Sequence, residues 1–94
     1  MKVNLKILLP VLSEAIGRKE LEVELAGETV NDLIEHLVTR YGRKAGQALY
    51  DKKDKLDPLV QILLNGKEWV AHDRLDTVLQ DGDKLVLMIM MGGG

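Results

Sequence analysis

Alternating apolar and polar positions predict two strands at the start of the chain. Residues 2–9 and residues 19–26 each alternate with a period of two, which is typical of a strand with one buried face. Leu8 is the exception, because it adds an apolar side chain to the polar face of the first strand. Pro10 cannot donate a hydrogen bond to a sheet and ends this strand. We therefore expect a loop after it and a hairpin partner in residues 19–26.

A helical period replaces the alternation in the next segment. Apolar residues within 30–41 recur every three or four positions, which predicts an amphipathic helix. Thr29 is a good N-cap, Asp32 stands three residues later as in a capping box, and Gly42 suits the end of a helix. A shorter helix is expected over residues 44–50, followed by a charged loop.

The second half of the chain returns to strand-like patterns. We expect a strand over residues 59–64, a turn at Asn65-Gly66, a short return strand over 67–71, a single helical turn over 75–79, a tight turn at Asp81-Gly82-Asp83 and a last strand over 84–91. One sheet with one covering helix is an α+β roll, so the pattern predicts a single small domain.

Composition excludes several classes of function. The 94 residues are 46% hydrophobic and 30% charged, with a net charge of −2 and no basic block longer than Lys52-Lys53. We therefore expect no nucleic acid partner and no polybasic membrane anchor, since both need a concentrated basic face. We also expect no membrane span, because the longest apolar run, residues 85–91, is too short to cross a bilayer. The absence of cysteine excludes disulfides and Cys-based catalysis, and favours a cytoplasmic protein. His36 and His72 lack the spacing of a metal site, so no metal is expected.

The C-terminal half carries an ordered set of motifs. An apolar strand ends in Asn-Gly within LVQILLNGKEW, and LDTVLQDGDKLVLMIMMGGG follows with a Leu, an Asp-Gly-Asp turn, a last apolar strand and terminal glycines. This order resembles the ubiquitin-like sulfur carriers of the MoaD/ThiS family, which include the small subunit of molybdopterin synthase. The resemblance implies a β-grasp fold, with a mixed sheet of four to five strands packed on one main helix. The domain would span residues 1–91 and a flexible glycine tail residues 92–94.

The resemblance also implies a function for the tail. Gly94 would be adenylated and converted to a thiocarboxylate that donates sulfur, above all in molybdopterin biosynthesis, while Gly92 and Gly93 thread into partner active sites. Glycine has no Cβ, so an extended run of glycines fits a narrow tunnel. Because three glycines follow Met91 where the family usually ends in a pair, Gly93 is an alternative reactive residue.

The partners follow from the same resemblance. They would be an adenylating enzyme of the ubiquitin-activating type that uses ATP, a persulfide sulfur donor, and an acceptor such as the large subunit of molybdopterin synthase. The chain itself would be a carrier or a non-catalytic subunit, with no bound cofactor and no catalytic residue.

Other interpretations stay open. Trp69 and the long segment over residues 43–58 also resemble the ubiquitin-related modifiers and the small archaeal modifiers, which carry sulfur for tRNA thiolation and can be conjugated to lysines. A non-conjugated ubiquitin-like binding module is a third possibility. The glycines alone are also consistent with a frayed chain end that has no function.

The alternation also predicts an apolar patch on the face of the sheet that a single helix leaves open. It would consist of Leu8, Leu63, Val86, Met88 and Met90. Exposed apolar patches usually mark partner surfaces, and Met suits a surface that accepts several partners. The alternatives are that these side chains pack under the loop over residues 50–58 or within a homodimer. Trp69 is expected to anchor the short return strand.

Overall fold

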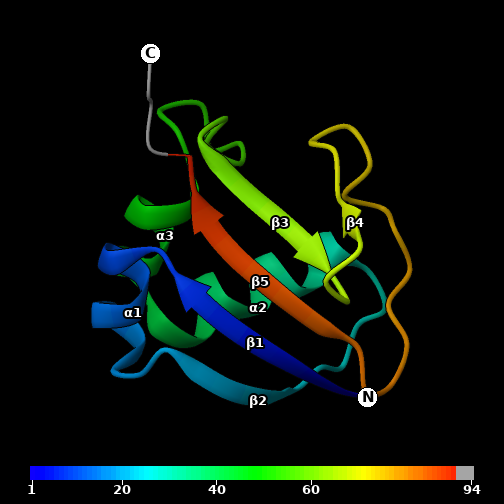
Figure 1. The fold of residues 1–94 in the computed structure, drawn as a ribbon. Coiled ribbons are helices and arrows are strands. Elements are labelled where there is room, and N and C mark those ends of the chain that lie inside the picture. The colour runs from blue at the N-terminus through cyan, green and yellow to red at the C-terminus, as the bar shows by residue number, and fades with distance from the viewer. Residues whose placement is uncertain (91–94) are drawn as a thin grey trace.

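A computed structural model describes residues 1–90 and shows a mixed five-stranded sheet with helices on one face (Figure 1). The elements are β1 (Lys2–Leu8), α1 (Pro10–Ile16), β2 (Glu20–Glu24), α2 (Val30–Tyr41), α3 (Arg43–Leu49), β3 (Val60–Leu64), β4 (Glu68–Trp69) and β5 (Lys84–Ile89). The strand order is β2-β1-β5-β3-β4, with β1 and β5 parallel and the other neighbours antiparallel. This is the α+β β-grasp architecture that the sequence predicts.

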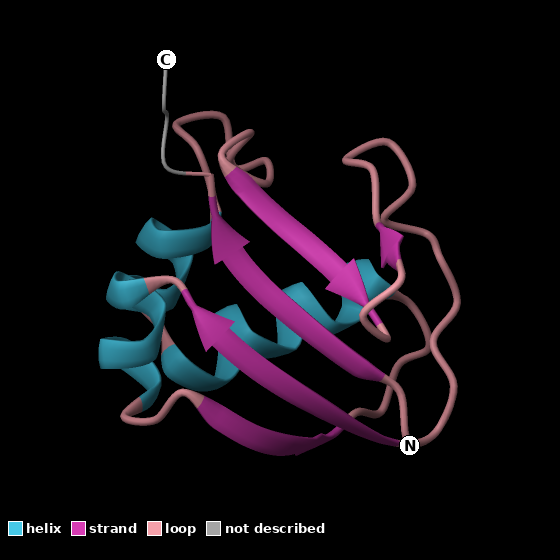
Figure 2. Cartoon of the chain, in the orientation of Figure 1, coloured by secondary structure: helices cyan, strands magenta, loops and turns pink. Residues whose placement is uncertain are grey.

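The core lies between the sheet and α2. In Figures 1 and 2, α2 crosses behind the central strands, α1 and α3 lie together at one side, and the face toward the viewer carries no helix. Inward-facing residues of β1, β3 and β5 are fully or almost fully buried, as are four residues along one side of α2: Val30, Leu33, Ile34 and Leu37. The sheet therefore has one buried face and one open face.

The start of α2 confirms the predicted capping box. The Thr29 hydroxyl accepts a hydrogen bond from the Asp32 backbone N–H at 3.1 Å, and Asp32 Oδ2 accepts from the backbone N–H of Thr29 at 3.1 Å. Asp32 Oδ2 also accepts from the backbone N–H of Glu28 at 2.9 Å. These bonds from Glu28 and Thr29 hold the pKa of Asp32 below its ordinary value, because they favour the charged carboxylate.

Two local predictions are wrong. Residues 10–16 form α1 and not a loop: Pro10 occupies the first turn, Leu12 is fully buried, and Gly17 ends the helix at φ 90°. The predicted helical turn over residues 75–79 is absent, because its backbone pairs with the segment before α2. Leu79 N–H donates to Glu28 O at 2.7 Å, and Val78 forms an isolated bridge with Thr29.

The two turn motifs of the C-terminal half hold each other. Asn65 Nδ2 donates to Asp83 Oδ1 at 3.0 Å, and the Lys84 backbone N–H donates to Asn65 Oδ1 at 2.9 Å. Asn65 and Gly66 have φ values of 53° and 69°, the left-handed conformation that this pair adopts readily in tight turns. The two turns therefore hold the end of β3 beside the start of β5.

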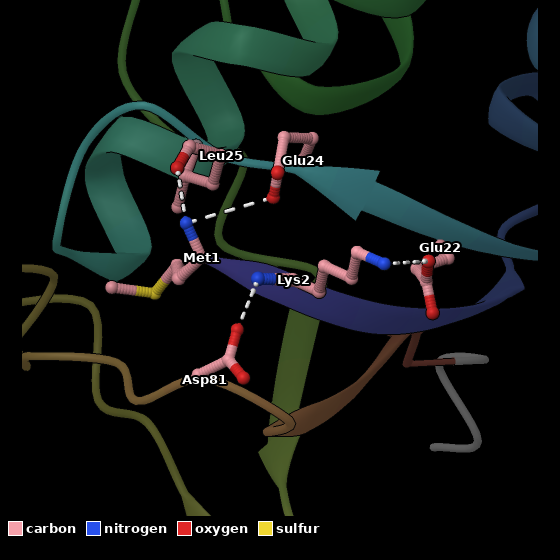
Figure 3. A network of polar contacts seen from close by, with 6 residues as sticks. All are labelled: Met1, Lys2, Glu22, Glu24, Leu25 and Asp81. Carbon is pink, nitrogen blue, oxygen red and sulfur yellow. Dashed lines mark hydrogen bonds and ion pairs between the residues drawn. The ribbon is translucent and has the colours of Figure 1, made fainter.

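Hydrogen bonds hold the N-terminus at the same end of the sheet (Figure 3). The Met1 ammonium donates to Leu25 O at 3.0 Å and lies 3.6 Å from Glu24. The Lys2 backbone N–H donates to Asp81 Oδ1 at 2.7 Å, which joins β1 to the turn before β5. The starts of the two parallel strands, β1 and β5, are therefore both anchored where the chain begins.

Candidate functional site

The register of the sheet brings the five predicted patch residues onto its open face. Leu8 of β1 lies beside Met88 of β5, and Leu63 of β3 lies beside Val86 of β5. Met90 continues the same alternation just after β5 ends. We call this set, Leu8, Leu63, Val86, Met88 and Met90, the sheet patch.

The sheet patch is accessible in the chain as described. Leu8 is 45% exposed and Met90 is 55% exposed, while the other three side chains are half-buried. The loop over residues 50–58 lines a hollow on the helix side together with Ile34 and Glu35 of α2, and it leaves Leu8 and Met90 of the patch about half exposed. Packing under this loop, one of the two alternatives for these residues, is therefore wrong.

Trp69 joins the patch, which the sequence analysis missed. It lies opposite Leu63 and is 59% exposed, so it does not anchor the short strand in the core. Three residues lie between the paired positions Leu64 and Glu68. The two-residue turn expected at Asn65-Gly66 would leave only two residues between the paired positions. A shift of one residue in register exchanges the faces of a strand, and here it turns Trp69 outward and Val70 inward. The apolar size of Trp69 was visible in the sequence, but its register was not.

The predicted reactive residues Gly92, Gly93 and Gly94 lie outside the described residues, as does Met91. The last described contact is at Met90, whose backbone N–H donates to Leu59 O at 2.8 Å. This bond holds the end of β5 beside the start of β3. The described part of the chain therefore ends at the edge of the sheet patch.

A charged stripe borders the sheet patch on the β1 and β2 side. The outward side chains of β2 are Glu20, Glu22 and Glu24, and Lys2 and Lys6 stand opposite them on β1. Lys2 Nζ lies 3.8 Å from Glu22, in an exposed ion pair (Figure 3). Such pairs contribute little stability, so the stripe mainly sets the charge pattern beside the patch.

The hollow on the helix side of the molecule lies between α2 and the loop over residues 50–58. Burial, and then the charges of Glu35 and Asp54, raise the pKa of Tyr50. Backbone hydrogen bonds from Lys55 and Lys53 lower the pKa of Asp51, which closes the loop. His72 Nε2 donates to Val60 O at 2.7 Å, a structural bond between a turn and β3. These polar groups stabilise the loop and the turn around the hollow.

The described part of the chain has neither a cluster of metal ligands nor a membrane-spanning helix. Within residues 1–90, no three His, Asp or Glu side chains lie close enough together to hold a metal ion. No helix among these residues has the length and apolar character needed to cross a bilayer.

The model of the ThiS family matches residues 7–94, which is almost the whole chain. The chain belongs to the ThiS family. This ThiS-family chain is 33% identical over 82 residues to small archaeal modifier protein 3 of Haloferax volcanii, covering 86% of this chain and 87% of that protein. It is 27% identical over 90 residues to a putative sulfur carrier protein of Archaeoglobus fulgidus, covering 96% and 98%.

The fold gives the same assignment. The crystal structure of SAMP1 from Haloferax volcanii superposes with a TM-score of 0.80 at 25% identity and covers all of both chains. The expected family resemblance is thus confirmed, and the relatives of this chain include a small archaeal modifier protein and a putative sulfur carrier protein.

Proposed function

We propose that this ThiS-family chain is a sulfur carrier that works through a thiocarboxylate at Gly94, with molybdopterin biosynthesis as the favoured pathway. The observation that carries the proposal is the family match, which extends through residue 94 and so includes the terminal glycines. The similarity to a putative sulfur carrier over 96% of the chain supports it. Gly93 takes the role of Gly94 if the last residue is removed.

The chemistry has two steps, both at the terminal carboxyl group. A carboxylate oxygen of Gly94 attacks the α-phosphorus of ATP, and pyrophosphate leaves to give an acyl-adenylate. A persulfide then attacks the acyl carbon and displaces AMP, which forms an acyl disulfide. A thiol reduces the S–S bond, leaves as part of a new disulfide, and frees the thiocarboxylate. This chain has no cysteine, so the persulfide and the thiol both come from partner proteins.

The chain acts in this proposal as a carrier and not as a catalyst. The two described carboxylates with lowered pKa values, Asp32 and Asp51, accept backbone hydrogen bonds that hold a helix start and a loop. Neither belongs to the sheet patch next to Met90. Adenylation and sulfur transfer therefore depend on groups that the partner enzymes bring to the tail.

The sheet patch is the proposed docking surface for these enzymes. Four residues extend at most about 14 Å, so an enzyme that holds Gly94 must approach Met90 to within that distance. Contiguous apolar surface next to the tail supports this role, because burying it on binding is favourable. An adenylating enzyme of the ubiquitin-activating type and an acceptor such as the large subunit of molybdopterin synthase would use this surface in turn.

A second candidate function is conjugation to lysines as a protein modifier. The 33% identity to a small archaeal modifier favours it, and the same adenylate intermediate serves both functions. In this case a lysine amine displaces AMP, and an isopeptide bond replaces the thiocarboxylate. Sulfur supply for tRNA thiolation is a further acceptor pathway for the same thiocarboxylate.

ATP–pyrophosphate exchange with the adenylating enzyme of the same organism tests the first step. We expect exchange with the full chain and none with the chain that lacks Gly93 and Gly94. Exchange that persists after this deletion would contradict adenylation at the tail. Lysine adducts of the chain in cell extracts, found by mass spectrometry, would identify the modifier function.

A further inference from the structure

The open face of the sheet is hollowed beside the end of β5. Side chains from three strands line this hollow: Gln61 of β3, Trp69 of β4, and Met88 and Met90 in and just after β5. Trp69 and Met90 are both more than half exposed although they are large and apolar. We call these four residues the Trp69 hollow.

The one polar side chain of the Trp69 hollow has a fixed orientation. Gln61 Nε2 lies 3.2 Å from the carbonyl oxygen of Pro58 and donates a hydrogen bond to it. Because a carbonyl oxygen only accepts, the amide nitrogen must be the atom that faces Pro58. Gln61 Oε1 is then left as an acceptor on the side of the amide away from that bond. The hollow therefore combines an apolar lining with one amide side chain.

The position of the hollow indicates what fills it. Gly94 stands four residues beyond Met90, a span of at most about 14 Å even when fully extended. Met90 itself lines the hollow. An enzyme that takes the terminal glycine into its active site therefore has its surface over or beside this hollow.

We infer that the Trp69 hollow receives a bulky apolar side chain of the adenylating enzyme, and that Trp69 determines the affinity of docking. The inference rests on the proposed function, and it identifies the anchoring residue within the docking surface. The two thioethers adapt their shape to the incoming side chain, and the Trp69 ring supplies a large rigid contact. Gln61 Oε1 accepts a hydrogen bond from a backbone N–H next to that side chain.

Trp69 suits this role because of where it lies. Tryptophan is enriched among the few interface residues that carry most of the binding energy, and these lie inside a ring of contacts that excludes water. Leu63 and Val86 extend the apolar surface inward from the hollow. An enzyme that covers this surface removes Trp69 from solvent.

The chain contains one tryptophan, so its emission reports docking once the emission of the enzyme alone is subtracted. We expect the Trp69 emission to shift to shorter wavelength, to saturation, when the adenylating enzyme is added to the full chain. The chain without Gly93 and Gly94 should show the same shift although it is not adenylated. Emission that does not change at saturating enzyme would overturn the inference.

Steady-state adenylation with variants supplies the second test. Trp69→Ala should raise the KM for the carrier roughly 10- to 100-fold with kcat little changed, the range expected for an anchoring residue. Trp69→Phe should restore part of the loss. Val78→Ala is the matched control, because Val78 is 63% exposed and bridges to Thr29 away from the patch. Its KM should stay at the wild-type value.

The two proposals fail in different ways. An unchanged KM for a folded Trp69→Ala variant would overturn the inference and leave the carrier function intact. A full chain that is never adenylated would refute the proposed function, while the emission titration would still decide whether the enzyme docks at Trp69.

Discussion

Two neighbouring residues of β5 should respond very differently to truncation. Leu87 is fully buried between the sheet and the helices, whereas Met88 is half-buried and faces the open side. Leu87→Ala should lower the free energy of unfolding by about 3 to 5 kcal/mol, because it removes a buried side chain and leaves a cavity. Met88→Ala should cost about 1 kcal/mol, roughly half of the value for burying a whole Met side chain.

Urea denaturation followed by circular dichroism measures both changes. With a slope near 1 to 1.5 kcal/mol per molar for a small domain, the Leu87→Ala midpoint should fall by roughly 2 to 5 M. The Met88→Ala midpoint should fall by less than about 1 M with an unchanged slope.

A Met88→Ala loss as large as that of Leu87→Ala would refute this reasoning, because it would mean that the outer face is covered in solution. A homodimer would cover it in this way. In that case the unfolding midpoint of the wild-type chain would rise with protein concentration, which provides an independent check. A midpoint that is independent of concentration is expected for an open face.

Three further predictions concern the start of α2 and the charged loop. Thr29→Ala should lower stability by about 1 kcal/mol in thermal or urea unfolding, because it removes the cap on the Asp32 N–H; an unchanged Tm would contradict this. Gly27→Ala should also destabilise the chain, since an added Cβ would lie 2.5 Å from Asp32 Cβ, whereas Gly46→Ala, 3.6 Å from Val38, should be tolerated. The pKa values of Asp32 and Asp51 are lower in the folded chain, so the unfolded state binds protons more readily. The stability that these two carboxylates contribute is therefore complete above about pH 4 and is lost as the pH falls through their folded-state pKa values. Asp32→Asn should flatten this part of the acid unfolding curve, and an unchanged curve would assign the effect to other groups.

The sequence predicts those elements that are determined by local chemistry. Thr29 and Asp32 define the start of α2 through their own side chains, and the Asn65-Gly66 turn follows from its tolerance of left-handed backbone angles. The period of two in β1 and β5 indicates which residues face the core. These features depend on residues that are close together in the sequence, so the sequence alone is enough to predict them.

The elements that were missed depend on contacts distant in sequence. The helix α1 has seven residues and one fully buried side chain, Leu12, too short for a clear helical period. Residues 75–79 form no helical turn because their backbone groups bind the segment before α2. Trp69 faces outward because of the register between β3 and β4, which three residues of separation determine. Pairing of this kind cannot be read from composition or period.

Two parts of the candidate site could be predicted from the sequence: the residues of the sheet patch, and the order of the motifs that lead to the terminal glycines. The sheet patch follows from alternation alone, and the family match includes the glycines that the motif order indicates. The part that needed the structure is the hollow at Trp69, since it forms only where β3, β4 and β5 meet.

The intact mass of the chain tests the central proposal most directly. The chain is incubated with its adenylating enzyme, ATP and a persulfide donor with a reducing thiol, and the product is mapped by fragmentation. The account predicts a mass increase that corresponds to one oxygen replaced by sulfur, located on Gly94, or on Gly93 if the last residue has been removed. An unchanged mass with an active enzyme and an intact tail would contradict the sulfur carrier function.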